Sequence, residues 1–238
     1  MKISVVIPAY NEEDYIGPTL ESLINKAGSD IYEIIVVDNA STDNTAKVAK
    51  SFKGVKVVRE DRKGLTRARQ AGLMAATGDL VAYIDADTQI KDRWFHHVKK
   101  EFEKNKRLVC LSAPYSVYDV SKWKRMLVWS YWNLLAYPTY MLLMKYMVLG
   151  ANFVARRSVL LKIGGFDQTI EFYGEDTDIA RRLNKVGKVK FLRKSLVTSS
   201  GRRMEAEGFV KIGAKYISNF LSEALLHRPI NQNYKDYR

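Results

Sequence analysis

The sequence is poor in the residues that cross-link small proteins and bind transition metals. It contains one cysteine and three histidines in 238 residues. A single cysteine cannot form an internal disulfide, so stability must come from a hydrophobic core, which a chain of this length is long enough to build. Cys110 lies in an apolar run, and we expect it in a buried strand. His96 and His97 lie in a predicted helix with no further partner at metal-ligand spacing, so we interpret them as surface or hydrogen-bonded residues.

Several sequence signatures are also absent. There is no G-x-G-x-x-G dinucleotide fingerprint, no P-loop and no internal repeat. No zinc, helix-turn-helix or stacking-aromatic motif accompanies the basic residues, which argues against a nucleic-acid partner. Strand-like residues begin at Ile3 and leave no room for a signal peptide, so we expect a cytoplasmic protein, either free or at the inner face of the cell membrane.

Charge is distributed unevenly along the chain. Residues 1–90 carry a formal charge of −2 and residues 91–238 carry +15, which together give the net +13. An anionic partner is therefore expected to meet the second part of the chain. Phosphorylated ligands and an anionic membrane surface are both candidates for that partner.

The first 90 residues alternate between strand and helix patterns. Short apolar runs at 3–8, 33–38, 55–58 and 80–84 predict strands, and amphipathic stretches between them predict helices. Strands separated by helices of this length form right-handed βαβ units. We therefore predict an α/β fold with a mixed, mostly parallel sheet flanked by helices.

The predicted strand at 80–84 is followed by two carboxylates, Asp85 and Asp87. Residues i and i+2 of an extended segment share a face, so both side chains can point to one place. Ligands of open α/β sheets bind beyond the carboxyl ends of the strands. Two hard oxygen donors there suit Mg²⁺ or Mn²⁺, although aspartates after a strand can also simply form a turn.

Residues 126–144 carry no formal charge, and that length meets the threshold for a membrane span. Pro138 in the middle and several Trp and Tyr residues argue against a span. Two interpretations remain open: a kinked helical pair buried as core, or one that lies in the membrane interface. Further on, Glu205–Leu226 has the apolar spacing of an amphipathic C-terminal helix.

Five stretches, taken in order over roughly residues 1–200, resemble the family 2 inverting glycosyltransferases of GT-A fold. They are Val6–Glu12, Ile35–Asp43, Gly64–Gly72, Asp85–Asp87 and Gly174–Asp176. The resemblance implies a glycosyltransferase with a nucleotide-sugar donor, UDP- or GDP-linked. It also implies a catalytic domain over 1–203, with a nucleotide-binding half at 1–90, an acceptor half at 91–203 that includes a helical insertion at 122–149, and a C-terminal helix and tail at 204–238.

The resemblance also assigns roles to individual residues. Asp38 would take the base or ribose, and Arg69 would lie near the diphosphate. Asp85, Ala86 and Asp87 match the metal-binding D-x-D motif. Asp176 matches the general base that deprotonates the acceptor, although a carboxylate at that position can also cap the following helix. The wall of the nucleotide pocket would be formed by Pro8, Ala9, Asn11 and Glu12.

Basic residues near the end of the domain add candidate phosphate or acceptor contacts, because guanidinium groups suit phosphate oxygens. The candidates are Arg181, Arg182, Arg202 and Arg203, and the acidic Glu175 beside Asp176 is a further candidate for contact with the acceptor. Members of this family often have a histidine after the last core strands as a further metal ligand, but residues 198–203 contain none. Either fewer protein ligands hold the metal, or basic residues replace part of its role.

The function we expect is therefore metal-dependent, inverting sugar transfer from a nucleotide-sugar. The aromatic run and the basic second half favour a lipid or lipid-linked acceptor at a membrane surface. If the acceptor is a phosphate, it needs no deprotonation, and Asp176 would only orient it. The alternative is a nucleotide-sugar-binding or membrane-recruitment module without catalysis. The sequence leaves the oligomeric state open.

Overall fold

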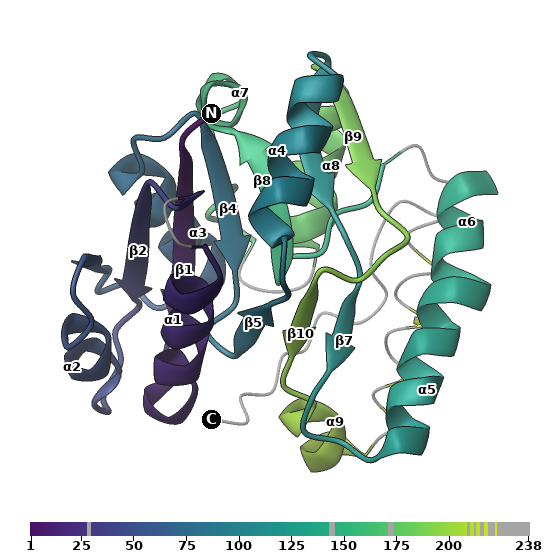
Figure 1. The fold of residues 1–238 in the computed structure, drawn as a ribbon, viewed down its shortest axis with the longest axis horizontal. Coiled ribbons are helices and arrows are strands. Elements are labelled where there is room, and N and C mark those ends of the chain that lie inside the picture. Colours follow the sequence, from purple (N-terminus) through teal and green to yellow (C-terminus); the bar gives the residue numbers. More distant parts are fainter. Residues whose placement is uncertain are drawn as a thin grey trace.

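The computed structural model describes residues 1–27, 30–142, 146–170 and 174–208, together with 210, 211, 213, 214, 217, 218 and 222. Within them, a main sheet has seven strands in the order β3-β2-β1-β4-β8-β6-β9 (Figure 1). Its strands are β1 (Ile3–Ala9), β2 (Glu33–Asp38), β3 (Val55–Arg59), β4 (Leu80–Ile84), β6 (Leu108–Ser112), β8 (Asn152–Arg156) and β9 (Lys188–Phe191).

The sheet is mostly parallel, as predicted. β3, β2, β1 and β4 run parallel to one another, while β8 is antiparallel to both β4 and β6. β9 is again parallel to β6. Every residue of β1, β4 and β6 is buried, which explains why these strands are continuous apolar runs in the sequence rather than alternating ones.

Helices cover both faces of this sheet. One face packs against α1 (Glu13–Ala27), α2 (Thr45–Lys50) and α4 (Trp94–Lys104), which supply residues such as Leu20 and Phe95 to one core cluster. The other face packs against α3 (Leu65–Ala75), α7 (Arg157–Lys162) and α8 (Glu175–Asn184), through residues such as Leu73 and Ile179. The predicted α/β fold, a mostly parallel sheet flanked by helices, is confirmed.

A second, smaller sheet lies beyond the carboxyl end of β4. It has three strands in the order β5-β10-β7, formed by β5 (Thr88–Ile90), β10 (Val197–Ser199) and β7 (Tyr115–Val117). Ser199 pairs with Thr88 across the β5–β10 ladder. Because Thr88 follows Asp87 directly, this pairing brings the end of the domain onto the D-x-D stretch.

The apolar insertion is a helical column made of α5 (Lys122–Ser130), a π-helical segment η2 (Tyr131–Ala136) and α6 (Tyr137–Leu142), which lie end to end along one side of the molecule (Figure 1). The π-helical turns come just before Pro138, where the proline lacks an N–H to donate. No described helix is long and apolar enough to cross a bilayer. Residues 143–145, at the end of the uncharged run, lie outside the described part of the chain.

Each of the two faces of this column has a different environment. Val128, Trp132 and Ala136 are buried against Phe191 and Met204. The opposite face leaves large apolar side chains exposed, namely Trp123, Met126, Leu127, Trp129, Leu134, Met141 and Leu142. The insertion is therefore core on one side, as one of the two interpretations predicts, and an exposed apolar surface on the other.

At the carboxyl end of the domain, α9 (Arg202–Glu207) follows β10. Asp119 accepts hydrogen bonds from the hydroxyl of Ser200 and the N–H of Gly201, and this fixes the start of the helix. Half of the predicted helix over 205–226 falls outside the described residues. α8 starts at Glu175, so Asp176 lies in the first turn of this helix.

Candidate active site

The site is built at the edge of the main sheet where parallel strands β1, β2 and β4 end. Ala9 at the end of β1 pairs with Asp38 at the end of β2, and Asp85 comes directly after β4. These three strands are neighbours in the sheet. The sequence-predicted residues Pro8, Ala9, Asp38, Asp85 and Asp87 therefore share one edge, as the carboxyl ends of parallel strands must.

Asp38 is 2% exposed and held from two sides. The backbone N–H of Ser41 donates to one carboxylate oxygen at 3.2 Å, and Arg59 forms an ion pair with the other. Arg59 is opposite Asp38 in the β2–β3 register, so the pair follows directly from the parallel alignment of these strands. Asp38, the residue predicted to contact the nucleotide, therefore has a carboxylate with a fixed orientation.

The loop after β1 links the first strand to the loop after β2. Asn11 has a φ of 51°, and its side-chain oxygen accepts the N–H of Thr42 at 2.9 Å. The next residue, Glu12, is 4% exposed, and its N–H donates to the hydroxyl of Thr45 at 2.7 Å. Asparagine tolerates the left-handed conformation better than most residues, and this turn directs the Glu12 carboxylate into the interior.

Asp87 is the more buried of the two D-x-D carboxylates, with 15% of its side chain exposed against 39% for Asp85. The hydroxyl of Ser199 donates to Asp87 Oδ1 at 3.1 Å, and Thr88 donates to Ser199 Oγ at 3.1 Å. Burial raises the pKa of Asp87, and the nearby Glu12 adds to this, while Arg202 opposes it. Ala86, between the two aspartates, is buried, and its carbonyl accepts the hydroxyl of Thr19 at 2.7 Å.

Arg202 crosses from α9 to this edge of the sheet. One guanidinium nitrogen lies 2.6 Å from Glu12 Oε1 and 3.3 Å from Asp87 Oδ2. The guanidinium carbon lies 4.1 Å above the ring of Tyr15. Burial lowers the pKa of Arg202, but the hydrogen bond and the charge of Glu12 outweigh it, so the pKa is raised and the group stays charged.

Arg69 forms a second bridge between carboxylates. It is 1% exposed, and its two terminal nitrogens lie 3.2 Å from Glu175 and 3.7 Å from Asp85. Gly150 lies directly behind this guanidinium, because a Cβ at position 150 would come within 2.4 Å of it. Arg69 therefore ties the start of α8 to the end of β4, which brings Asp176 to the same site as Asp85.

Asp176 is half-buried in the first turn of α8, and its carboxylate accepts the N–H of Thr177 at 2.8 Å. Burial raises its pKa to about 7, with a further contribution from the charge of Glu175, while Arg69 opposes the shift. A carboxylate with a pKa near neutrality is a stronger base than an ordinary aspartate and is still ionised at pH 8. This is the property that general-base catalysis requires.

The remaining sequence-predicted arginines pair with carboxylates of their own helices. Arg181 contacts Asp178 at 2.9 Å, and Arg203 contacts Glu207 at 3.0 Å. Arg182 contacts Asp178 and also donates to the carbonyl of Gly165 at 2.6 Å. Of the four arginines at the carboxyl end of the domain, Arg202 is the one that contacts the D-x-D carboxylates in the described structure.

The side-chain oxygen atoms at this site fit a hard divalent cation that takes most of its ligands from a bound phosphate and from water. Within the described residues, no group of three or more His, Cys, Asp or Glu side chains is arranged to hold a metal. Two carboxylates on Asp85 and Asp87 nevertheless suit Mg²⁺ or Mn²⁺, because such ions often bind one or two carboxylates and take their other ligands from phosphate and water. Asp85, the more exposed of the two, offers the more accessible oxygen atoms.

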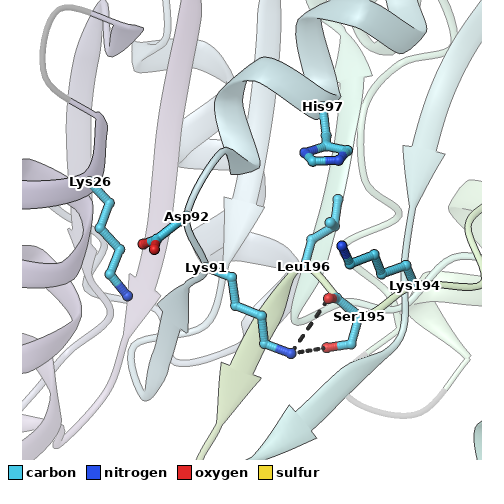
Figure 2. A pocket seen from close by; sticks show the side chains of 7 residues that line it. All are labelled: Lys26, Lys91, Asp92, His97, Lys194, Ser195 and Leu196. Carbon is cyan, nitrogen blue, oxygen red and sulfur yellow. Dashed lines mark hydrogen bonds between the residues drawn. The ribbon is translucent and has the colours of Figure 1, made fainter.

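A cavity of about 370 Å³ is lined in part by Lys91 and Asp92, which directly follow β5 (Figure 2). Lys26, Lys91 and Lys194 line it together with Asp92, His97, Ser195 and Leu196. The ammonium group of Lys26 donates to the carbonyl of Ile90 at 2.8 Å, and that of Lys91 to the hydroxyl of Ser195 at 3.0 Å. These contacts join α1 to the end of β5, and the residue after β5 to the segment before β10.

Sequence reasoning missed several residues that hold the predicted ones in place. Arg59 could have been found, because it ends the third strand just as Asp38 ends the second. Ser199, Tyr15 and Asp119 gave no comparable signal. Their roles depend on the packing of β10 and α9 against residues about 80 to 190 positions earlier in the chain.

Comparison with known proteins identifies the family. Residues 4–164 match the model of the family described as "Glycosyl transferase family 2". The uncharacterized glycosyltransferase EpsJ of Bacillus subtilis is 30% identical over 107 residues, which cover 43% of this chain and 31% of EpsJ. The probable glycosyltransferase YdaM of the same species is 26% identical over 208 residues, which cover 78% of this chain and 47% of YdaM.

Solved structures show the same fold. The mannosyltransferase PcManGT of Pyrobaculum calidifontis, in complex with GDP-Man and Mn²⁺, superposes with a TM-score of 0.70 at 17% identity, covering 94% of this chain and 64% of that one. S. aureus TarS 1–349, in complex with UDP-GlcNAc, gives a TM-score of 0.67 at 19% identity, covering 98% and 68%. The chain spans less than a third of the length of EpsJ, and about half that of YdaM.

Proposed function

Because this chain belongs to glycosyl transferase family 2, we propose that it transfers a sugar from a UDP- or GDP-sugar to an acceptor hydroxyl with inversion at the anomeric carbon. The observation that carries the proposal is the group of acidic residues, joined in pairs by two arginines, at one edge of the sheet. Asp85 and Glu175 are joined by Arg69, Glu12 and Asp87 are joined by Arg202, and Asp176 adjoins Glu175. This arrangement supplies the charges that diphosphate departure and acceptor activation require.

The donor binds along the ends of β1, β2 and β4 in this proposal. Asp38, held by Arg59 and Ser41, accepts hydrogen bonds from the base or ribose, and Pro8, Ala9 and Asn11 line the same pocket. TarS and PcManGT have been solved with a UDP-sugar and a GDP-sugar respectively, which supports a nucleotide-sugar but leaves both nucleotides as candidates. Arg202 lies beside Asp87, where it can reach the diphosphate.

Asp176 acts as the general base. It takes the proton of the acceptor hydroxyl as the oxygen attacks the anomeric carbon from the face opposite the nucleotide. Arg69 holds Glu175 and Asp85 and so fixes the first turn of α8 against the donor edge. Asp85 and Asp87 would hold Mg²⁺ or Mn²⁺, which when bound neutralises the charge of the departing diphosphate.

The acceptor is lipid-linked in this proposal, and the exposed apolar face of α5 and α6 rests on an anionic membrane surface. Trp123 and Trp129 are 55% and 59% exposed on that face, and Lys122 and Arg125 are exposed beside them. Apolar and aromatic side chains flanked by cations are the composition that binds the interface of an anionic bilayer. The catalytic domain spans 1–203 in this proposal, so Arg202 lies at its end.

The test is the Asp176→Asn variant, assayed for release of UDP or GDP from nucleotide-sugars in the presence of membrane lipid extract. We expect kcat to fall by about 10²- to 10⁴-fold, the range for loss of a positioned base, with little change in donor affinity. A kcat within about threefold of the unsubstituted enzyme would exclude Asp176 as a base. It would instead favour an acceptor phosphate, which needs no deprotonation.

A further inference from the structure

The Asp87 carboxylate already has a cation beside it in the folded chain. Arg202 lies 3.3 Å from Asp87 Oδ2, on the side that is not taken by the hydroxyl of Ser199. A divalent ion that bound Asp87 would have to share this carboxylate with the guanidinium. Like charges at such separations repel strongly in a partly buried site.

Arg202 is held in this position by contacts that do not involve the D-x-D motif. Glu12 accepts its hydrogen bond at 2.6 Å, and Tyr15 lies under its guanidinium at 4.1 Å. The side chain of Glu12 is 5% exposed and that of Arg202 is 24% exposed, so the pair is largely shielded from water. A partly desolvated ion pair with an aromatic platform keeps a long side chain in one orientation.

The backbone that carries Arg202 is also fixed. Asp119 accepts the N–H of Gly201, and the N–H of Ser200 donates to the carbonyl of Asp87 at 3.2 Å. The N–H of Arg202 donates to the hydroxyl of Ser200 at 3.1 Å. The backbone next to Arg202 is therefore hydrogen-bonded to Asp87, and this fixes the guanidinium beside the Asp87 carboxylate.

From this geometry we infer that Arg202, positioned by Glu12 and Tyr15, is a resident cation of the donor site that shares with the divalent metal the neutralisation of the donor diphosphate. The inference rests on the proposed function, because it assumes that a nucleoside diphosphate binds at Asp85 and Asp87. It has two consequences of opposite sign. Arg202 strengthens binding of the diphosphate when metal is absent, and it weakens binding of the metal when nucleotide is absent.

The experiment measures both affinities on the full chain and its Arg202→Gln variant. Affinity for UDP and for GDP is measured by calorimetry in EDTA and in Mn²⁺, and affinity for Mn²⁺ alone is measured from the spin-resonance signal of the free ion. We expect Arg202→Gln to weaken nucleotide binding in EDTA by about 10- to 100-fold, as for loss of a charge-assisted hydrogen bond, and less in Mn²⁺. We expect the same variant to bind Mn²⁺ alone at least about threefold more tightly.

Three further variants separate positioning from general damage. Arg202→Lys keeps the charge and should recover part of the nucleotide affinity in EDTA. Glu12→Gln keeps the shape of the partner but removes its charge, and should weaken nucleotide binding in EDTA by about 3- to 10-fold because Arg202 is no longer held. Lys99→Gln is the matched control, because it removes a cation from an ion pair of 2.6 Å with Asp30, away from the site, and should change neither affinity.

The outcomes distinguish this inference from the proposed function. If the unsubstituted chain binds UDP or GDP only with Mn²⁺, and Arg202→Gln changes neither the nucleotide affinity nor the Mn²⁺ affinity, the inference is overturned while the donor site stands. If Arg202→Gln weakens both nucleotide and Mn²⁺ binding, its role is structural and the inference is again overturned. If the unsubstituted chain binds neither nucleotide under any condition, the proposed function falls, and the inference falls with it.

Discussion

At the scale of single residues, the carboxylates of Glu175 and Asp176 follow one another at the start of α8, and the guanidinium of Arg69 pairs with the first of them. One cation between Asp85 and Glu175 leaves Asp176 in a partly buried, acidic environment, and this raises its pKa to about 7. Buried carboxylates with raised pKa values are common at catalytic sites. The same environment has consequences for both activity and stability.

The first consequence is the pH dependence of transfer. A general base must be unprotonated to accept the proton, so the active fraction of the enzyme rises as pH increases through the pKa of Asp176. We expect kcat/KM to fall about tenfold per pH unit below about 7 and to level off above it. Nucleotide release measured from pH 5.5 to 9 with saturating Mn²⁺ checks this. A profile that stays flat down to pH 5.5 would show that Asp176 is not the base.

The second consequence concerns stability. A carboxylate whose pKa is higher in the folded chain than in the unfolded chain binds its proton more tightly when folded. Its contribution to stability is therefore fully present below the unfolded value of 3.8 and is lost as pH rises through about 7. Asp176→Asn removes this charge, so we expect the variant to gain about 2–4 °C in Tm at pH 8, on the order of 1 kcal/mol, and little at pH 5. Differential scanning fluorimetry at the two pH values measures the gain, and Glu103→Gln, at an exposed position of α4, serves as the control.

At the scale of elements, the start of α9 depends on close approach of two chain segments. Gly201 has an ordinary backbone conformation, but a Cβ there would lie 2.3 Å from Val120 Cγ1. Alanine at this position would push α9 away from β7 and carry Arg202 away from Glu12 and Asp87. The energetic cost is steric crowding rather than backbone strain.

We therefore expect Gly201→Ala to lower the free energy of unfolding by about 1–3 kcal/mol, the usual cost of overpacking, and to weaken nucleotide binding as well. Gly17→Ala is a matched control, because Gly17 lies inside α1 and its nearest neighbour beyond that helix, Val48 Cγ1, would be 3.8 Å from the new Cβ. That control should gain about 0.5–1 kcal/mol from the better helix former. Chemical denaturation gives both values, and equal effects of the two substitutions would contradict the steric argument.

The elements also show which parts of the structure a sequence can predict. β1, β2 and β4 are apolar runs bounded by polar residues, so their positions could be predicted, and so could the carboxylates at the ends of β2 and β4. The start of α8 is harder to predict, because Gly174 with a φ of 96° precedes three acidic residues that are equally typical of a loop. The β5–β10 pairing joins residues 88–90 to 197–199, and no local pattern predicts a contact at that separation. Arg202 was selected for its chemistry, but its bond to Glu12 depends on that pairing.

At the scale of the whole molecule, the excess of positive charge and the apolar insertion lie in the same part of the chain. The basic second part of the chain contains the insertion, whose inward face completes a core cluster and whose outward face is exposed. Trp132 is 7% exposed and its ring centroid lies 5.5 Å from that of Tyr115, whereas Trp129, three residues earlier, is 59% exposed. The sequence alone could not show which of these two tryptophans is buried, because the π-helical segment Tyr131–Ala136 alters the helical periodicity.

The two tryptophans therefore make opposite predictions. Trp132→Ser should lower the free energy of unfolding by about 3–5 kcal/mol, as expected for loss of a buried aromatic residue. Trp129→Ser should leave Tm within about 2 °C but release the protein from anionic vesicles, because an exposed indole contributes to membrane binding and little to the core. Flotation with vesicles of phosphatidylglycerol and phosphatidylcholine, compared with phosphatidylcholine alone at low and high salt, measures the binding. Binding that is equal on both lipids and insensitive to salt would remove the electrostatic part of the proposal, and a stable Trp132→Ser variant that still binds would show that the inward face is not core.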